Sequence, residues 1–365
     1  MIRSLSNTAA HWTPLLLSLS IALSGCSEAA PQEPATQTQQ PIQTGLNVWH
    51  WNVAGSVLHG GRITTGLIER MGDSIRNNNA EFVTVNEICR KQYTALISNL
   101  QGGGGSQWNT AESFARFRVM KSGASFNPGG EQKELQQLCG CNPDSPYFPT
   151  CTEENDYGLA IFYKNGFGST ESLLLEDDPN TGEDYWLLCG TSALLPHLRL
   201  CGTHVTWSPN CIARPGIGIC TTGTQLNQIR SYLDMRYLEQ DTVIVGGDFN
   251  VEPNDFRLDD WYTSAVNGRN NPDNHGRYHE LDDNDICPGY GEITFEHGTP
   301  SHNLCGEFKK IDLFFVRAAQ VSDYDLDSRG IPQTCDTNVD TDQLRNNPCS
   351  DHHKIDGYAS LSVVP

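Results

Sequence analysis

Short runs of β-forming residues recur along most of this chain, and they restrict its fold more than any other feature. Runs of this kind predict strands at 46–53, 81–86, 114–120, 157–163, 198–207, 242–245, 311–316 and 358–363. Helices are predicted between some of them, at 63–75, 91–100 and 225–238. No internal repeat and no second region of globular composition interrupts this order. The sequence therefore predicts a single α/β domain with a layered sheet core.

The charge balance of the chain is acidic. It has 24 Lys and Arg against 44 Asp and Glu, which gives a formal net charge of −20 at pH 7. An acidic surface repels polyanions at long range, so a broad basic face for nucleic acid is not expected. The charge does not exclude an enzyme that reaches phosphate through a divalent cation, because a bound cation reverses the local charge.

The N-terminus resembles an export signal. Arg3 precedes an apolar stretch at 15–23 that is too short to span a bilayer stably. Leu23-Ser24-Gly25-Cys26 follows directly and resembles a bacterial lipobox, in which the cysteine thiol receives a lipid. An ordinary cleaved signal with an incidental cysteine is the alternative. We expect anchoring to the bacterial cell envelope, with a lipoprotein signal at 1–26, a disordered tether at 27–45 and the folded domain at 46–365.

The number of cysteines supports export. Without Cys26, the 13 cysteines of the chain become an even set of twelve, which indicates disulfides in an oxidising compartment. A zinc site is less well supported, because no CxxC pair occurs. Connectivity does not follow from sequence; nearest-neighbour pairing gives Cys189–Cys201, Cys211–Cys220, Cys287–Cys305 and Cys335–Cys349.

The sharpest local motif is Gly246-Gly247-Asp248-Phe249-Asn250, which follows a hydrophobic strand. Glycines allow a sharp turn and a close approach of backbones. Alternation places Asp248 and Asn250 on one side, where a carboxylate and an amide can orient a water molecule and hold a phosphate oxygen. A simple turn is the alternative, since Asp and Asn are common in turns.

A second motif, Ser350-Asp351-His352, precedes the last predicted strand. His352 can act as a general base or donate a hydrogen bond to charge that develops on a phosphate. It needs an acidic partner, and Asp312 is a candidate because it lies in an apolar strand where an unpaired charge is costly. The alternative is a buried salt bridge from Asp312 to Lys310 or Arg317. The adjacent His353 is expected to be solvated.

Three further polar residues end predicted strands, and none is distinctive alone. Glu87 suits Mg²⁺, which prefers carboxylates and phosphate oxygens, but taken alone it is better explained as a glutamate that stabilises the N-terminus of the following helix through its dipole. Asn52 ends the first strand. His204 could bind phosphate, although a lone histidine in such a place is more often structural.

Taken in order, these motifs resemble the DNase I-like endonuclease/exonuclease/phosphatase superfamily. The resemblance spans about residues 46–364 and is carried by Trp51-Asn52, Asn86-Glu87, Tyr157-Gly158-Leu159-Ala160-Ile161, Thr203-His204, Gly247-Asp248-Phe249-Asn250, Ile311-Asp312 and Ser350-Asp351-His352. It implies a four-layer α/β sandwich, in which helices flank two packed β-sheets. It also implies Mg²⁺-dependent hydrolysis of phosphate esters, with Mn²⁺ or Ca²⁺ as substitutes.

The resemblance assigns roles position by position. The implied metal residues are Glu87, Asn52 and Asp351. The implied catalytic residues, which orient the nucleophile or contact phosphate, are Asp248, Asn250, His352 with Asp312, His204 and, by a looser match, Tyr157. His204 is also a candidate acid, as in the DNase and toxin branches.

The sequence departs from the superfamily pattern in three places. Asn86 stands where the superfamily usually has Gln, a change that keeps an amide. The carboxylate partner of His204 is not identified, and Glu153, Glu154 and Asp156 are candidates. Two cysteine-rich insertions, at 122–155 and 208–222, are not superfamily features and are expected to shape substrate access.

Two other charge patterns carry less weight. Asp323, Asp325 and Asp327 alternate but lack the glycine and glutamate of an EF-hand loop, so we expect a solvated strand face. Arg116, Arg118 and Lys121 also alternate, and could contact a nucleic-acid backbone or form a solvated basic face.

The sequence favours an exported nuclease that cleaves DNA, with RNA as a further substrate. A sphingomyelinase-like lipid phosphodiesterase is an alternative, although no long aromatic hairpin for membrane insertion is evident. A phosphomonoesterase uses the same chemistry. From another class, a non-catalytic surface-binding protein could keep this scaffold. We expect nucleic acid as substrate, a membrane contact through the lipid on Cys26, no obligate protein partner and a monomer.

Overall fold

The computed structural model describes residues 40–56, 58–102, 108–115, 156–178, 184–207, 220–266, 273–283, 291–295, 310–337 and 349–365. They belong to one compact unit, Gln39–Pro365. Several predictions fall outside these residues: the lipobox and tether, most of the cysteine-rich insertions, and the residues Arg116, Arg118, Lys121, Glu153, Glu154, Cys211, Cys287 and Cys305. None of the described helices is long and apolar enough to cross a membrane.

Two six-stranded mixed sheets form the centre of the protein. The first has the strand order β11-β12-β1-β2-β4-β3 and consists of β1 (Ile42–Asn52), β2 (Phe82–Cys89), β3 (Asn109–Ala115), β4 (Tyr157–Tyr163), β11 (Val321–Arg329) and β12 (Lys354–Val363). The second has the order β5-β6-β7-β8-β10-β9 and consists of β5 (Phe167–Leu174), β6 (Trp186–Ser192), β7 (Leu198–His204), β8 (Thr242–Asp248), β9 (Tyr278–Glu280) and β10 (Asp312–Arg317).

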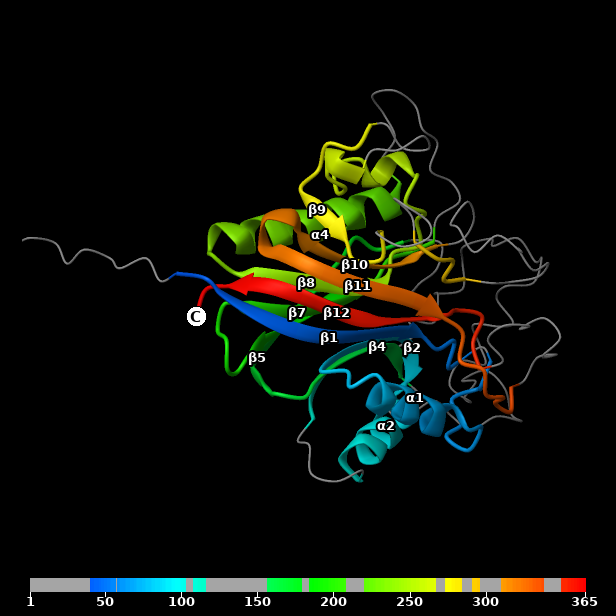
Figure 1. Cartoon of the computed structure of the whole chain (residues 1–365). Coiled ribbons are helices and arrows are strands. Elements are labelled where there is room, and N and C mark those ends of the chain that lie inside the picture. Colours follow the sequence, from blue (N-terminus) through cyan, green and yellow to red (C-terminus); the bar gives the residue numbers. More distant parts are fainter. Residues whose placement is uncertain are drawn as a thin grey trace, which may run out of the picture. The chain divides into compact units, whose positions relative to one another are not determined.

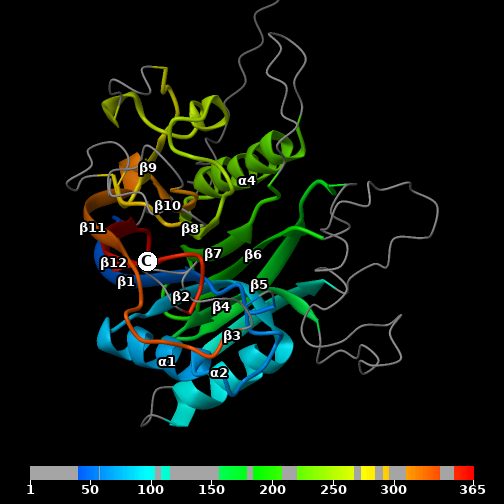
Figure 2. The ribbon, with the colours of Figure 1, turned by 90° about the vertical axis from the view of Figure 1, so that its right-hand side faces the viewer.

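Helices cover the outer face of each sheet (Figures 1 and 2). Helices α1 (Leu67–Asn77) and α2 (Arg90–Gly102) lie on the first sheet, and α4 (Thr221–Leu238) lies on the second. Short 3₁₀ helices are η3 (Phe256–Leu258), η4 (Ser264–Val266) and η5 (Ala318–Gln320). The predicted four-layer α/β sandwich is therefore confirmed.

The alternation of side chains along each strand explains why the hydrophobic core has three layers. On β1, Trp49 and Trp51 face α1 and α2, whereas Leu46 and Val48 face the second sheet. All four side chains are buried. Because successive strand residues point to opposite faces, a central strand with apolar residues on both faces must lie between two layers. Each such buried side chain contributes about 1.5–3 kcal/mol to folding.

Most predicted elements are present, but their bounds differ in places. The strand at 157–163 has the predicted bounds, while the strand predicted at 114–120 begins earlier, at Asn109, and is described only to Ala115. Helix α1 begins at Leu67 rather than at 63, because Gly66 before it adopts a left-handed conformation with φ of 87°. Strands β5, β6 and β9 were not predicted; β5 is a largely exposed, polar edge strand.

Two of the predicted disulfides are confirmed, Cys189–Cys201 between β6 and β7 and Cys335–Cys349 before the last strand. Cys89 and Cys220 are disulfide-bonded as well. Two of the three aspartates of β11 are exposed on the edge of the sheet as predicted, Asp323 and Asp325, whereas Asp327 is partly buried.

Candidate active site

One end of the two sheets collects the polar residues that the sequence marks. Asn52 ends β1, which runs parallel to β2, and His204 and Asp248 end the parallel strands β7 and β8. In register, His204 lies opposite Asp248, and Asp248 lies opposite Asp312 at the start of antiparallel β10. Carboxyl ends of parallel strands therefore meet the amino end of an antiparallel one, which brings residues far apart in sequence together.

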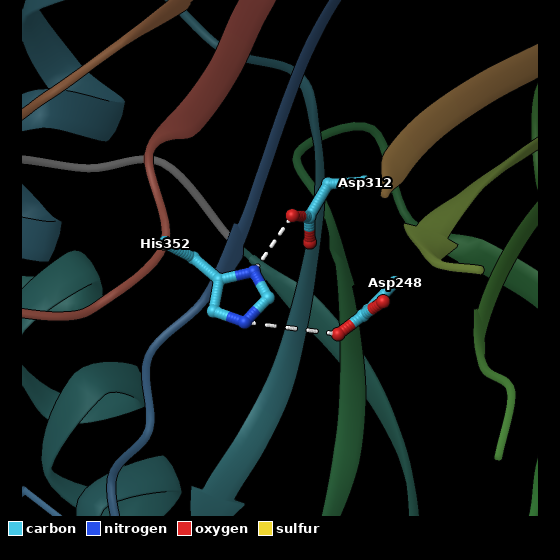
Figure 3. Close-up of side chains that lie close together, drawn as sticks. All are labelled: Asp248, Asp312 and His352. Carbon is cyan, nitrogen blue, oxygen red and sulfur yellow. Dashed lines mark hydrogen bonds and ion pairs between the residues drawn. The ribbon is translucent and has the colours of Figure 1, made fainter. Parts of the chain in front are cut away.

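His352 and Asp312 form a buried pair at this end (Figure 3). Nδ1 of His352 lies 2.7 Å from Oδ2 of Asp312, and Nε2 of His352 lies 3.8 Å from Oδ2 of Asp248. Asp312 is fully buried and His352 is 5% exposed. The alternative salt bridges of Asp312 are not formed: Lys310 Nζ lies 2.6 Å from Glu280 Oε2, and Arg317 pairs with Asp234.

A second histidine, which the sequence analysis missed, also binds Asp312. Nε2 of His50 lies 2.9 Å from Oδ1 of Asp312, and Nδ1 of His50 lies 2.6 Å from the hydroxyl of Thr84. The signal was present in the sequence, because alternation places His50 on the same face of its strand as Asn52, two residues later. The flanking Trp49 and Trp51 point to the opposite face of the strand, toward α1 and α2.

The charges of this group depend on one another. Burial would lower the pKa of His352, but the carboxylate of Asp312 outweighs burial and raises it to about 10. Burial would raise the pKa of Asp312, but His352 and His50 lower it well below its usual range. The pair is therefore ionised at neutral pH, with an imidazolium next to a carboxylate.

The side-chain amide of Asn52 joins Asp248 to Glu87. Nδ2 of Asn52 donates to Oδ2 of Asp248 and to Oε1 of Glu87, at 3.0 Å in each case. Burial, and then repulsion from Asp312, raise the pKa of Asp248 well above its usual range. One oxygen of Asp248 and one of Glu87 consequently lie around Nδ2 of Asn52. Their negative charge is not fully balanced there.

Glu87 is aimed at this group by an irregular backbone. It adopts a φ of 57°, which is uncommon outside glycine, and it lies where the pairing of β2 with β4 shifts register between Val85 and Ile88. Bulges of this kind reorient side chains and are frequent near active sites. Asn250 has a φ of 51°, and its side-chain amide donates to Val205 O. Such residues cost about 1–3 kcal/mol each.

Asn86 anchors the end of β8, where Asp248 lies. Its Oδ1 accepts a hydrogen bond of 2.8 Å from the backbone N–H of Asp248. The amide at this position therefore links the two sheets and fixes the end of β8. A glycine is required at the preceding position on β8, because a Cβ on Gly247 would lie 2.0 Å from Thr203 O on the neighbouring strand β7.

His204 completes the polar group from the second sheet. Its Nε2 lies 3.8 Å from Oδ2 of Asp248 and 4.0 Å from Oε1 of Glu87. Burial lowers the pKa of His204, and the charge of Glu87 only partly opposes this effect. Among the candidate partners within the described residues, Asp156 instead pairs with Arg90.

The loop before β12 holds His352 by several main-chain contacts. Ser350 Oγ donates to Asn52 O at 2.7 Å and accepts from His352 N, and Trp51 Nε1 donates to His352 O at 2.8 Å. His59 Nε2 lies 2.7 Å from Cys349 O. Ser350, which the sequence analysis left without a role, therefore fixes the motif to the end of β1.

Residues 294 and 295 support both members of the pair from the other side. Thr294 Oγ1 accepts from the backbone N–H groups of Ile311 and Asp312, each at 2.9 Å, and the Phe295 ring centroid lies 4.8 Å from that of His352. The expectation that His353 is solvated is wrong. It is 6% exposed, because its backbone N–H donates to Thr294 O and holds the segment against this loop.

Two predicted residues lie less centrally. Tyr157 begins β4 opposite Cys89, two residues beyond Glu87, and packs with Cys89 in a small buried cluster. Asp351 precedes His352 and is half-buried, and its charge contributes to the raised pKa of His352.

The donor set fits a divalent cation of the Mg²⁺ type. Glu87 and Asp248 offer carboxylate oxygens, which hard cations prefer, and a cation there would relieve the burial and repulsion that raise the pKa of Asp248. Within the described residues, Asp248, Asp312 and His352 also offer atoms within 4.8 Å of one another. Because Asp312 and His352 bind each other, Asp248 is the residue of the three that can offer an oxygen atom to a cation.

Comparison with known proteins identifies the family and the fold of the chain. The profile of the Endonuclease/Exonuclease/phosphatase family matches residues 49–352. The fold is similar to the human Nocturnin catalytic domain with bound sulfate, with 12% identity and a TM-score of 0.54 over 88% of this chain and 97% of that one. It is also similar to an endonuclease/exonuclease/phosphatase family protein from Bacteroides thetaiotaomicron, with 14% identity and a TM-score of 0.50 over 89% of this chain and 100% of that one.

No curated protein matches the chain significantly in sequence, so the assignment rests on the family profile and on the fold. The profile covers all of the strand-end residues from β1 to His352, and the members of this family are generally phosphoric ester hydrolases that use divalent metals. The chain belongs to the endonuclease/exonuclease/phosphatase family.

Proposed function

We propose that this protein is a divalent-metal-dependent phosphodiesterase that hydrolyses nucleic acid, with DNA as its main substrate. The observation that carries the proposal is the position of Asp248. Its Oδ2 lies 3.0 Å from the amide that also binds Glu87, and 3.8 Å from Nε2 of both His204 and His352. The carboxylate of Asp248 therefore lies among a second carboxylate, which can bind a cation, and two imidazoles. This arrangement is suited to the hydrolysis of a phosphate ester.

In this proposal, Glu87 and Asp248 hold the cation, with Asn52 between them. When bound, the cation would supply Lewis-acid stabilisation and position the phosphate for in-line attack. Asp351 is a further candidate ligand, and its charge contributes to the raised pKa of the adjacent His352.

Asp248 is also proposed to orient the attacking water. Burial and repulsion from Asp312 raise its pKa in the metal-free protein, and a bound cation would lower that pKa again, so Asp248 would act as a carboxylate that accepts a hydrogen bond from the water. Asn250 supports it, because Asn250 N donates to Oδ1 of Asp248 at 2.8 Å. The Oδ2 atom accepts from Asn52 and faces the two histidines.

His352 is the proposed donor to the phosphate. The raised pKa keeps its ring protonated at neutral pH, so Nε2–H can stabilise charge on a phosphate oxygen or protonate the leaving oxygen. His204 is mostly neutral in the free protein, because burial lowers its pKa, and it is better suited to a hydrogen bond than to delivering the proton. Tyr157 is proposed to support the strand end rather than to touch phosphate.

A cleavage assay with matched variants tests this function. Protein lacking residues 1–26 is incubated with plasmid DNA, with sphingomyelin and with p-nitrophenyl phosphate, each with Mg²⁺ or with EDTA. The proposal expects Mg²⁺-dependent nicking of DNA, lost in His352→Gln. The control is His197→Gln, which removes another histidine–aspartate contact, to Asp241, at the opposite end of β7.

The outcomes separate the substrate from the chemistry. If only sphingomyelin or the monoester is hydrolysed, nucleic acid is the wrong substrate, although phosphoester hydrolysis stands. If no substrate is hydrolysed with Mg²⁺, Mn²⁺ or Ca²⁺, the enzymatic function is wrong, and a non-catalytic binding protein becomes the better account.

We also propose that the protein is exported as a monomer and anchored to the cell envelope through a lipid on Cys26, with 27–45 as tether and 46–365 as the enzyme domain. The even set of twelve remaining cysteines supports an oxidising compartment. Metabolic labelling with a radioactive fatty acid should label the wild type and not Cys26→Ser. Equal labelling of both would refute the anchor.

A further inference from the structure

His50 is a fully buried ionisable side chain for which the proposed mechanism has no use. It lies on β1, two residues before Asn52, and its exposed fraction is 0%. Both ring nitrogens are engaged: Nε2 lies 2.9 Å from Oδ1 of Asp312, and Nδ1 lies 2.6 Å from the hydroxyl oxygen of Thr84. Burial of an imidazole with such contacts indicates a specific role, since apolar residues would fill the same layer more cheaply.

The chemistry of the partners decides which nitrogen of His50 carries the proton. An ionised carboxylate only accepts hydrogen bonds, and Asp312 is held ionised at neutral pH, so Nε2 of His50 must be the donor. In the tautomer that carries its proton on Nε2, Nδ1 is an acceptor, and the Thr84 hydroxyl can donate to it. Thr84 lies directly opposite His50 in the register of β1 with β2, so the pairing of these strands fixes this contact.

Asp312 is thereby held by an imidazole on each oxygen. Oδ1 accepts from His50, Oδ2 accepts from His352 at 2.7 Å, and the backbone N–H of Asp312 donates to Thr294. A carboxylate with one strong partner can still rotate about its Cβ–Cγ bond. A second charge-assisted hydrogen bond on the other oxygen prevents that rotation.

We propose that His50 is a positioning residue for hydrolysis: by binding Oδ1, it orients Asp312 so that Oδ2 fixes the ring of His352. The inference rests on the proposed function. It adds a third member, from the first sheet, to the pair that Asp312 and His352 form. His50 does not touch the substrate in this account and acts only through Asp312.

The test replaces His50 by a residue that can donate and by one that cannot. His50→Gln keeps an N–H₂ group that can reach Oδ1, whereas His50→Leu fills the space without a donor. His50→Leu should lower kcat by about tenfold to a hundredfold, the value of a hydrogen bond to a charged group, and change KM by less than about twofold. His50→Gln should restore most of kcat. His197→Gln, which breaks a histidine–aspartate contact far from the site, should leave kcat unchanged.

A spectroscopic measurement tests the geometry without any substrate. The Nδ1 proton of His352, bound to Asp312, should give a strongly downfield proton resonance in the wild type and in His50→Gln. In His50→Leu it should move upfield or broaden through exchange. If the wild type shows no phosphodiesterase activity, the proposed function fails, while this resonance still reports whether His50 orients the pair.

Thr84→Val provides a second variant if His50→Leu does not fold. It keeps the shape of Thr84 and removes the hydroxyl that holds Nδ1 of His50. It should lower kcat by several-fold, by about half the logarithmic effect expected for loss of the donor. Equal kcat and an unchanged His352 resonance in a folded His50→Leu, or in Thr84→Val where that is the variant that folds, would overturn the proposal.

Discussion

Nε2 of His204 and Nε2 of His352 lie at the same distance, 3.8 Å, from the same atom, Oδ2 of Asp248, although His204 ends β7 of the second sheet and His352 lies in the loop before β12 of the first. Neither distance is short enough for a direct hydrogen bond. The two imidazoles therefore approach the carboxylate without saturating it. Two donors can bind the same phosphate oxygen from two sides only if they lie close together and do not hydrogen-bond to each other.

The pairing of Asp312 with His352 predicts non-additive variants. Asp312→Asn and His352→Gln should each lower kcat by about 10²–10⁴, the usual contribution of a positioned acid or base. The double variant should be little worse than either single one, because each change alone already disables the pair. Steady-state kinetics on an oligonucleotide measures the cycle. Effects that multiply would show that the two residues act independently.

The metal assignment predicts a stability effect that does not depend on turnover. Saturating Mg²⁺ at about 100 times its Kd should stabilise the wild type by about 2.7 kcal/mol and raise Tm by about 5 °C. Glu87→Gln should remove most of this shift, because it loses a charged ligand. Glu239→Gln, at the exposed end of α4, is the matched control and should keep it. An identical Mg²⁺ shift in both variants would rule out Glu87 as a ligand.

The raised pKa of His352 predicts a pH dependence of stability in metal-free buffer. The pKa of His352 rises from 6.5 to about 10 on folding, because Asp312 outweighs burial. Protonation of His352 thus stabilises the folded state fully below pH 6.5, and this contribution is lost as pH rises through about 10. Urea unfolding with EDTA should show the difference between wild type and His352→Gln shrinking from pH 6.5 to 10. A constant difference would contradict the assignment.

The Cys335–Cys349 bond predicts a link between a disulfide and activity. It closes 14 residues and ends next to Ser350, whereas Cys189–Cys201 closes 12 residues between β6 and β7. Replacing either pair by serine should cost a similar amount, about 3 kcal/mol. Only loss of the Cys335–Cys349 bond should lower kcat at a temperature where both variants are folded, because this loss frees the loop that carries His352. Equal loss of kcat in both variants would show a general effect of stability.

The order of the strands and the main site residues could be read from the sequence for a physical reason. Buried strands need unbroken apolar runs, and polar residues at their ends, such as Asp248 and Asp312, stand out against those runs. The strand Tyr157–Tyr163 is recognisable on the same ground. An edge strand such as β5 (Phe167–Leu174) is mostly exposed, so its polar residues give little signal.

Other features depend on contacts that only the folded chain creates. The positive φ of Glu87 arises from a shift of strand register, which no local pattern reveals. His50 reaches Asp312 across 262 residues of sequence, and His353 is covered because Thr294 binds its backbone. Burial of polar side chains is set by such long-range partners, so the sequence did not indicate the role of His50, and the prediction that His353 is solvated was wrong.

Hydrolysis of an oligonucleotide with one cleavable phosphodiester, carried out in ¹⁸O-labelled water with Mg²⁺, tests the central claim most directly. Mass spectrometry should find one ¹⁸O atom in the phosphate product of the wild type, and a rate lower by about 10²–10⁴ for His352→Gln. No product with any divalent metal, or equal rates for the two proteins, would contradict the account.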